Sequence, residues 1–197
     1  MNTLIIPIDK LIASWPWYLA RSAGFLAIIL LITLMISGIG HVTGWTYKVI
    51  EPVKAWFLHK WISYCLIAVT LIHIVALLFD KYIKFSVADI LVPFANFYSN
   101  KSTFFGIPLG WIAIPAGILS LYGIIFIVVV SLRLANKKRT WKFTHIISYL
   151  VAALVFIHAL GAGTDLDSGI LRWITMAVFL VLITATGFRL FHQSKLT

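Results

Sequence analysis

Long uncharged stretches, separated by short polar connections, dominate the pattern of this chain. A helix needs about 20 mostly apolar residues to cross the hydrocarbon core of a bilayer. Four stretches reach that length, and a fifth of 16 residues does so if Arg172 and Arg189 beside it extend toward the headgroups. The five stretches are 22–47, 61–79, 102–132, 143–164 and 173–188. The pattern therefore predicts an all-α integral membrane protein, a bundle of about five transmembrane helices.

The remaining segments are expected to form the surfaces of a single transmembrane domain covering residues 1–197. Residues 1–14 lack the basic region and cleavage site of a signal peptide, so we expect a retained N-terminal interfacial segment. Residues 80–101 are partly apolar but interrupted by charges and a proline, which is typical of an interfacial loop or a short surface helix. The third stretch is expected to bend near Pro108 and Pro115.

The composition agrees with a membrane setting. Hydrophobic residues make up 61% of the 197, charged residues only 11%, and the mean hydropathy is +1.01, values that exclude an ordinary soluble domain. The net charge of +10 is explained by topology signals and anionic membrane lipid, and no nucleic-acid-binding motif is present. Cys65 is the only cysteine, so an internal disulfide is excluded.

The distribution of basic residues predicts the orientation. Segment 133–142 holds five Lys or Arg and no acid, whereas the connection before the fifth stretch begins with Asp165 and Asp167. Because basic residues concentrate in cytoplasmic loops, 133–142 is expected to be a basic cytoplasmic loop. The N-terminus and the loop 80–101 would then lie outside and the C-terminus in the cytoplasm, in a multi-pass protein of the cell's inner (plasma) membrane.

Two stretches each carry a pair of histidines almost one bilayer apart, His59 with His73 and His145 with His158. Spacings of 13 or 14 residues cover roughly 20 Å of helix, which fits inside the hydrocarbon core. A neutral imidazole there must find a partner, and ionisable groups at membrane depth usually mark a function. Taken singly, each histidine could form an interhelical hydrogen bond instead.

Facing pairs of these histidines can hold two haem irons. Under the predicted topology both helices run in the same direction, so His59 meets His145 near the cytoplasm and His73 meets His158 near the outside. The first pair would bind the inner haem iron and the second the outer one. Two axial imidazoles leave no open position for a substrate, which favours electron transfer.

The two helices differ in the angular positions of their histidines. Fourteen residues keep His59 and His73 on one face of their helix, but thirteen leave His145 and His158 roughly 140° apart. We therefore expect a π-bulge, or a shift at the helix start near His145, to bring both rings toward the other helix.

The asymmetric spacing and its surroundings resemble the transmembrane ferric reductase domain shared by metalloreductases and NADPH oxidases. Trp56 precedes His59 and Trp141 precedes His145, as in that family. Further similar runs are 19–24, 89–94 and 161–165. The resemblance covers nearly the whole chain and implies a membrane oxidoreductase with two b-type haems.

By this resemblance, electrons would pass from a cytoplasmic flavin reductase or a membrane quinol to an external acceptor such as ferric iron or another oxidant. The sequence ends at Thr197 without a flavin domain, so we expect a separate donor. Arg21 would contact a haem propionate or the acceptor, and is otherwise an interfacial anchor. Lys60 and Lys142 would pair with inner propionates, or simply mark the cytoplasmic side.

Two other classes of function stay open. A metal or proton transporter could use the membrane histidines, although no intramembrane Asp or Glu accompanies them. A non-catalytic anchor subunit would tolerate replacement of all four. His41 and His192 lie at stretch ends, where solvated interfacial histidines are expected, and Gly24, Gly38 and Gly117 are expected to allow close helix packing.

Overall fold

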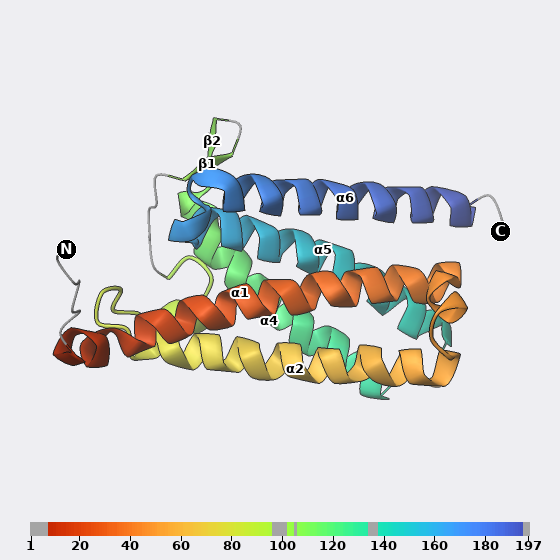
Figure 1. Cartoon of the computed structure of the whole chain (residues 1–197), viewed down its shortest axis with the longest axis horizontal. Helices are drawn as coiled ribbons and strands as arrows, with labels where there is room; N and C mark the ends of the chain where they lie inside the picture. Colours follow the sequence, from red (N-terminus) through yellow and green to blue (C-terminus); the bar gives the residue numbers. More distant parts are fainter. Residues whose placement is uncertain (1–7, 96–101, 105, 134–137, 195–197) are drawn as a thin grey trace, which may run out of the picture.

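Five long α-helices lie side by side in the computed structural model (Figure 1). It describes the backbone of residues 8–95, 102–104, 106–133 and 138–194, and the side chains of 14–95, 102–104, 106–133 and 143–188. The helices are α1 Ile8–Thr43, α2 Pro52–Leu78, α4 Gly110–Arg133, α5 Lys138–Ala162 and α6 Gly169–Ser194. Each contains a stretch long and apolar enough to cross a membrane, so the predicted fold class is confirmed.

Four of the five helices begin earlier than the uncharged stretches do, whereas α4 begins at Gly110, eight residues after the start of the predicted stretch 102–132. α2 starts at Pro52, whose fixed φ suits the first helical position, nine residues before the predicted start. Charged residues do not end a helix, because long side chains such as that of Lys54 reach solvent or headgroups from a helical backbone. For the same reason α5 begins at Lys138, inside the predicted loop 133–142. The predicted segment 1–14 is described only from Ile8, where α1 starts.

The connections are short. The 3₁₀ helix η1 Trp45–Lys48 follows Gly44, whose φ of 74° favours glycine, and joins α1 to α2. Helix α3 Val87–Leu91, with a capping box, lies within the predicted surface segment 80–101. Strands β1 Thr103–Phe104 and β2 Ile107–Pro108 form a small antiparallel hairpin before α4, and η2 Thr164–Leu166 joins α5 to α6.

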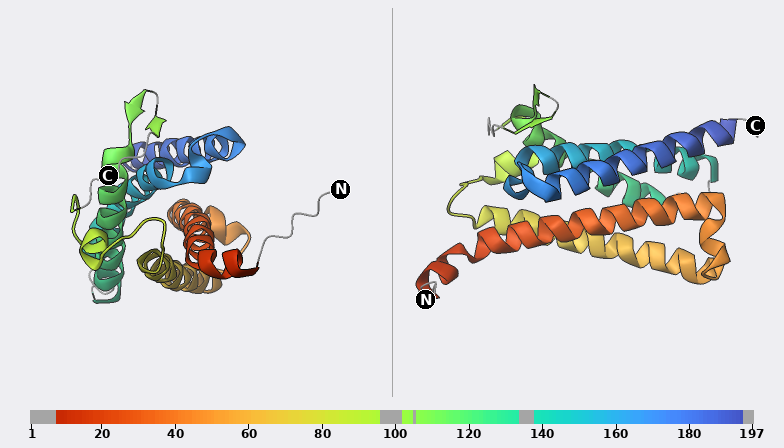
Figure 2. Two further views of the ribbon diagram at one scale, coloured as in Figure 1. Left: turned by 90° about the vertical axis from the view of Figure 1, so that its left-hand side faces the viewer. Right: turned by 45° about the horizontal axis from the view of Figure 1, so that its top comes forward.

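Two helix hairpins make up most of the bundle. α1 packs along α2 and α4 along α5, while α6 lies beside α1 and α5 (Figure 2). α2 and α5, the helices that carry the paired histidines, do not approach each other closely along their backbones. The histidine side chains of α2 and α5 meet between the two hairpins while the two backbones stay apart.

The bundle has two ends. We call the end that contains the α1–α2 connection the Lys48 end and the opposite end, with the α5–α6 connection, the Asp165 end (Figure 1). The start of α1 lies at the Asp165 end and the end of α6 at the Lys48 end, as an odd number of spans requires. Which end faces the cytoplasm stays a prediction.

Candidate functional site

The four predicted histidines meet in two pairs between the hairpins. His59 of α2 and His145 of α5 have ring centres 6.4 Å apart. His73 and His158 have ring centres 6.3 Å apart, nearer the Asp165 end. The pairing is the one expected from the sequence, His59 with His145 and His73 with His158.

The separation of the rings fits one metal between each pair. Metal–imidazole bonds of about 2.0–2.1 Å, with each nitrogen about 1.1 Å from its ring centre, put two trans imidazole centres about 6.3 Å apart. The observed 6.3 and 6.4 Å match this value. The separation within each pair is therefore explained without a direct hydrogen bond between its two imidazole rings.

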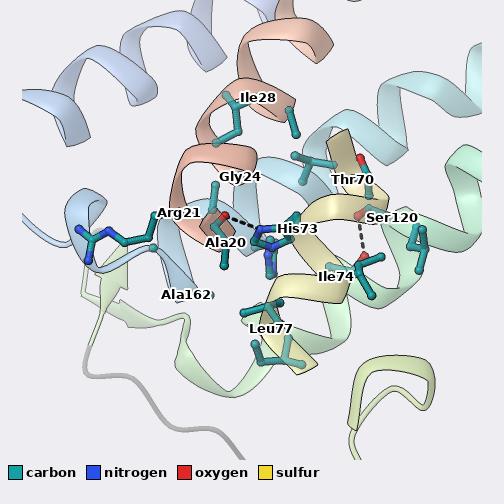
Figure 3. A pocket seen from close by; sticks show the side chains of 18 of the residues that line it. Ala20, Arg21, Gly24, Ile28, Thr70, His73, Ile74, Leu77, Ser120 and Ala162 are labelled. Atoms are coloured by element: carbon teal, nitrogen blue, oxygen red, sulfur yellow. Dashed lines mark hydrogen bonds between the residues drawn. The ribbon is translucent and has the colours of Figure 1, made fainter. Parts of the chain in front are cut away.

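Neighbouring helices hold the far side of three of the rings. His73 Nδ1 lies 2.7 Å from the Ala20 carbonyl oxygen (Figure 3), and His158 Nδ1 lies 2.9 Å from that of Ala113. Because a carbonyl only accepts, both Nδ1 atoms carry the proton and both Nε2 atoms keep a free lone pair. His59 Nδ1 lies 3.1 Å from the Ser37 hydroxyl. Metal-binding histidines typically show this pattern, in which the second nitrogen is anchored and the first is left for the metal.

Glycines make room for the same rings. A Cβ on Gly117 would lie 2.5 Å from His158 Nδ1, and one on Gly24 would lie 3.4 Å from His73 Nδ1. Each glycine follows its anchoring carbonyl, Ala113 or Ala20, by one helical turn. The sequence predicted close helix packing at these glycines, and in the structure the close neighbour is an imidazole.

A cavity of about 260 Å³ opens beside His73 and His158. Apolar side chains of α1, α2, α4 and α5 line most of it, and Arg21, Asp80 and Asp165 stand among its polar groups. Arg21 pairs with Asp165, donates a hydrogen bond of 3.0 Å to the Thr164 hydroxyl, and stacks 4.0 Å from the Trp17 ring centre. In Figure 3 Arg21 reaches toward the α5–α6 connection and away from His73.

The paired histidines do not form a metal site from protein groups alone. Among the described residues, no group of three or more His, Cys, Asp or Glu side chains is arranged to hold a metal ion. Each pair would supply two imidazole nitrogens, and a metal held there would take its other ligands from a bound group. A porphyrin supplies four nitrogens in one plane, so haem fits this donor set better than a bare ion does.

Comparison with known families agrees with this chemistry. The pattern of the family described as "Ferric reductase like transmembrane component" matches residues 22–156, more than half of the chain. The chain belongs to this family. No curated protein and no solved structure matches it significantly. Membership in a ferric reductase-like family, which generally binds haem, indicates a membrane oxidoreductase component with a transmembrane electron-transfer function.

The match includes three of the four histidines. It ends at residue 156, two residues before His158, and begins one residue after Arg21. The geometry at His158, with its anchored Nδ1 and its ring 6.3 Å from that of His73, is therefore an observation independent of the family pattern.

The predicted π-bulge in α5 is wrong. Residues 138–162 of this ferric reductase-like chain form a continuous α-helix without a π-turn. Both rings nevertheless reach α2, because a histidine side chain has two rotatable bonds and its ring direction is set by the groups around it. For His158 that group is the Ala113 carbonyl on α4.

Lys60 and Lys142 were predicted to pair with inner propionates or simply to mark the cytoplasmic side, and of these two lysines only Lys60 has a described side chain. Lys60 Nζ lies 5.2 Å from the Trp56 ring centre and 5.8 Å from that of Tyr64. Both aromatic rings are on the exposed face of α2, so these contacts favour the reading of Lys60 as an interfacial residue. Lys142 lies in α5, but its side chain is outside the described residues.

His41 lies closer to the paired histidines than the sequence indicated. Its ring centre is 5.5 Å from that of His59, its Nδ1 lies 3.2 Å from the Tyr47 hydroxyl, and its Nε2 is buried. The η1 turn that follows Gly44 carries Tyr47, and the packing of α2 along α1 brings His59, so both groups meet His41. In the sequence, the only indication of this position was the pair of glycines, Gly40 and Gly44, on both sides of His41. His192, the other predicted interfacial histidine, lies outside the described side chains.

Proposed function

We propose that the protein carries electrons across the membrane between two haem b groups. His59 and His145 would be the axial ligands at the Lys48 end, and His73 and His158 those at the Asp165 end. The observation that carries this proposal is the pair of imidazole separations, 6.4 and 6.3 Å, each matching two trans ligands of one metal. When bound, haem would supply a one-electron carrier at each level.

The residues around the rings hold them ready for this role. The carbonyls of Ala20 and Ala113 keep the proton on Nδ1 of His73 and His158, so Nε2 is free without a shift of tautomer. Rigid support of this kind lowers the reorganisation that accompanies ligation.

The region between the two pairs favours electron transfer over ion transport. Leu31, Leu66, Ala152 and Phe156 form a buried apolar cluster with Met35 and Leu182. Leu66 lies midway between His59 and His73 on α2, and Ala152 lies midway between the histidines of α5. Ions and protons need polar groups or water along their path, whereas an electron does not. The cluster therefore argues against the transporter alternative.

The donor and the acceptor follow from the predicted orientation. A flavoprotein or a membrane quinol delivers electrons at the Lys48 end, which is the cytoplasmic side in this proposal. An external oxidant such as ferric iron accepts them at the Asp165 end, each electron reducing one Fe³⁺ to Fe²⁺. Residues 133–142 then face the cytoplasm and 80–101 the outside of the plasma membrane. Arg21, at the edge of the cavity, would contact a propionate or the acceptor.

The test is haem content in the purified, detergent-solubilised protein. We expect about two b-type haems per chain by pyridine haemochrome, with an absorption change on adding dithionite. Single variants H73L and H59L should each keep about one haem, and H192L, which lies outside both pairs, should keep two. Absence of haem after expression with adequate haem supply would refute the proposal. Haem-free divalent-metal flux would then indicate a transporter, and neither property would indicate an anchor subunit.

A further inference from the structure

Helix α1 meets the two histidines of α2 at two glycines. A Cβ on Gly38 would lie 3.8 Å from Cε1 of His59, and one on Gly24 would lie 3.4 Å from Cε1 and Nδ1 of His73. The two glycines are 14 residues apart, and so are the two histidines. Because the helices are antiparallel neighbours, each glycine marks the level on α1 of the ring that it faces.

Outside each of these levels α1 carries a polar side chain. Arg21 comes three residues before Gly24, on the side of the Asp165 end, and His41 comes three residues after Gly38, on the side of the Lys48 end. At about 1.5 Å per residue, His41 lies roughly 4–5 Å along the axis beyond Gly38. His41 therefore lies between the level of His59 and the Lys48 end of the bundle.

The His41 ring is held at one nitrogen and has no partner at the other. Nδ1 lies 3.2 Å from the Tyr47 hydroxyl, whereas Nε2 is buried and has no hydrogen-bond partner in the described part of the chain. The ring centre is 5.5 Å from that of His59. A buried polar atom without a partner is costly and calls for an explanation such as a bound group. Nε2 is thus available to a polar group bound beside His59.

A haem b held by His59 and His145 would bring such a group. Its porphyrin carries two carboxylates on one edge, and burying their charge in the bilayer is costly. That edge is therefore expected to face the nearer membrane surface, which for this pair is the Lys48 end. His41 lies on that side of the pair.

We propose that His41 binds a carboxylate of the haem at the Lys48 end, through a hydrogen bond donated by Nε2. This inference rests on the proposed function. The Tyr47 hydroxyl can donate to Nδ1, which leaves the proton of the ring on Nε2, and a carboxylate accepts it as a hydrogen bond. His41 then has the role at the Lys48 end that Arg21 has in the proposed function at the Asp165 end.

Loss of this donor should change one haem only. Without the hydrogen bond the negative charge of the carboxylate is less well compensated, which favours ferric over ferrous iron and lowers the midpoint potential. We expect H41F to lower the potential of the transition that H59L removes, by up to about 59 mV for a tenfold change in a one-electron equilibrium. The same haem should be retained about tenfold less tightly, as expected for a lost hydrogen bond to a charged group.

The experiment is a potentiometric titration of the purified holoprotein followed by absorption, with haem loss to excess apomyoglobin measured on the same samples. H41Q and H41N form the matched pair, because the amide nitrogen of glutamine reaches the position of Nε2 and that of asparagine only the position of Nδ1. H41Q should stay near the wild-type values, and H41N should resemble H41F. T43V is the control on α1, because the Thr43 hydroxyl already bonds to the Ile39 carbonyl, and both transitions should be unchanged.

The outcomes separate this inference from the function beneath it. Unchanged potentials and unchanged haem loss in H41F overturn the inference and leave the proposed function standing, and so do equal values for H41Q and H41N. A shift of the transition that H73L removes, with the other unchanged, also overturns it. If H41F folds poorly, the comparison of H41Q with H41N still decides, since both variants carry a small amide. A wild-type protein without haem overturns both the inference and the proposed function.

Discussion

Replacement of Gly117 by alanine should displace His158. A Cβ at this position would lie 2.5 Å from Nδ1, 2.8 Å from Cε1 and 3.0 Å from Cγ of the ring. Ordinary contacts of this kind begin near 3.4 Å, so the ring must move by about 0.9 Å. The α4 backbone is closely packed here, with Ala113, Pro115 and Ala116 all buried, so the imidazole ring is the group expected to move.

The displacement of the His158 ring should weaken metal binding at this position. His158 Nδ1 is 2.9 Å from the Ala113 carbonyl, and a movement of about 0.9 Å away from α4 breaks this hydrogen bond. Loss of a supporting contact of this type typically costs 10–100-fold in metal affinity, and the overpacking costs a further 1–3 kcal/mol. The gain in helix propensity from Gly to Ala, about 0.5–1 kcal/mol, does not offset these losses.

Two other glycines provide graded controls. A Cβ on Gly24 would lie 3.4 Å from His73, an ordinary contact, so G24A should keep both haems or weaken one slightly. Gly187 in α6 has nothing within 4 Å of its Cβ position, so G187A should keep two haems and be slightly more stable.

The assay is haem per chain together with thermal unfolding in detergent. G117A should hold about one haem per chain, with the remaining spectrum matching that of H158L. A G117A protein that holds two haems at wild-type potentials would refute the argument that this glycine exists to accommodate the imidazole.

Three further outcomes follow from the structure. Phe156 is 1% exposed and stacks on Phe179 at 4.5 Å, so F156A should destabilise the protein by about 3–5 kcal/mol in detergent unfolding, more than F188A, whose ring is 72% exposed. D165N removes the negative partner of Arg21, so the Asp165-end transition should move to a more positive potential while the other transition does not. Prolonged EDTA treatment should leave the dithionite-induced absorption change intact, because haem iron is not stripped by a chelator as an ion bound only to side chains would be; loss of that signal would contradict haem ligation.

The sequence predicted the number of membrane-spanning helices better than the residues at which they begin and end. Uncharged runs revealed five spans because the bilayer tolerates few charges, and that constraint is visible residue by residue. It does not reveal where a helix starts. α2 continues back through Lys60 and Lys54 to Pro52, since the backbone stays helical where side chains have already reached the interface.

The pairing of the histidines was also predictable, but not the groups that orient them. Spacing along α2 and α5 gave the levels at which the rings meet. The anchors of His73 and His158 are backbone carbonyls of alanines, and an alanine in a membrane helix carries no chemical signal. The ion pair of Arg21 with Asp165 joins helix α1 to the α5–α6 connection, and both residues were visible in the sequence without any pattern that linked them.

The apparent conflict of phase in α5 shows why the anchors matter. On a regular helix His145 and His158 leave the backbone roughly 140° apart, so one direction along α2 cannot serve both. The conflict disappears if the direction of each ring on α5 is set by contacts with α4, the other helix of the same hairpin, and not by α2, the helix that the ring faces. His158 Nδ1 turns toward the Ala113 carbonyl, and the ring centre lies 6.3 Å from that of His73. At the other level the His145 ring centre still comes within 6.4 Å of that of His59, so a regular α5 brings a histidine to α2 at both levels.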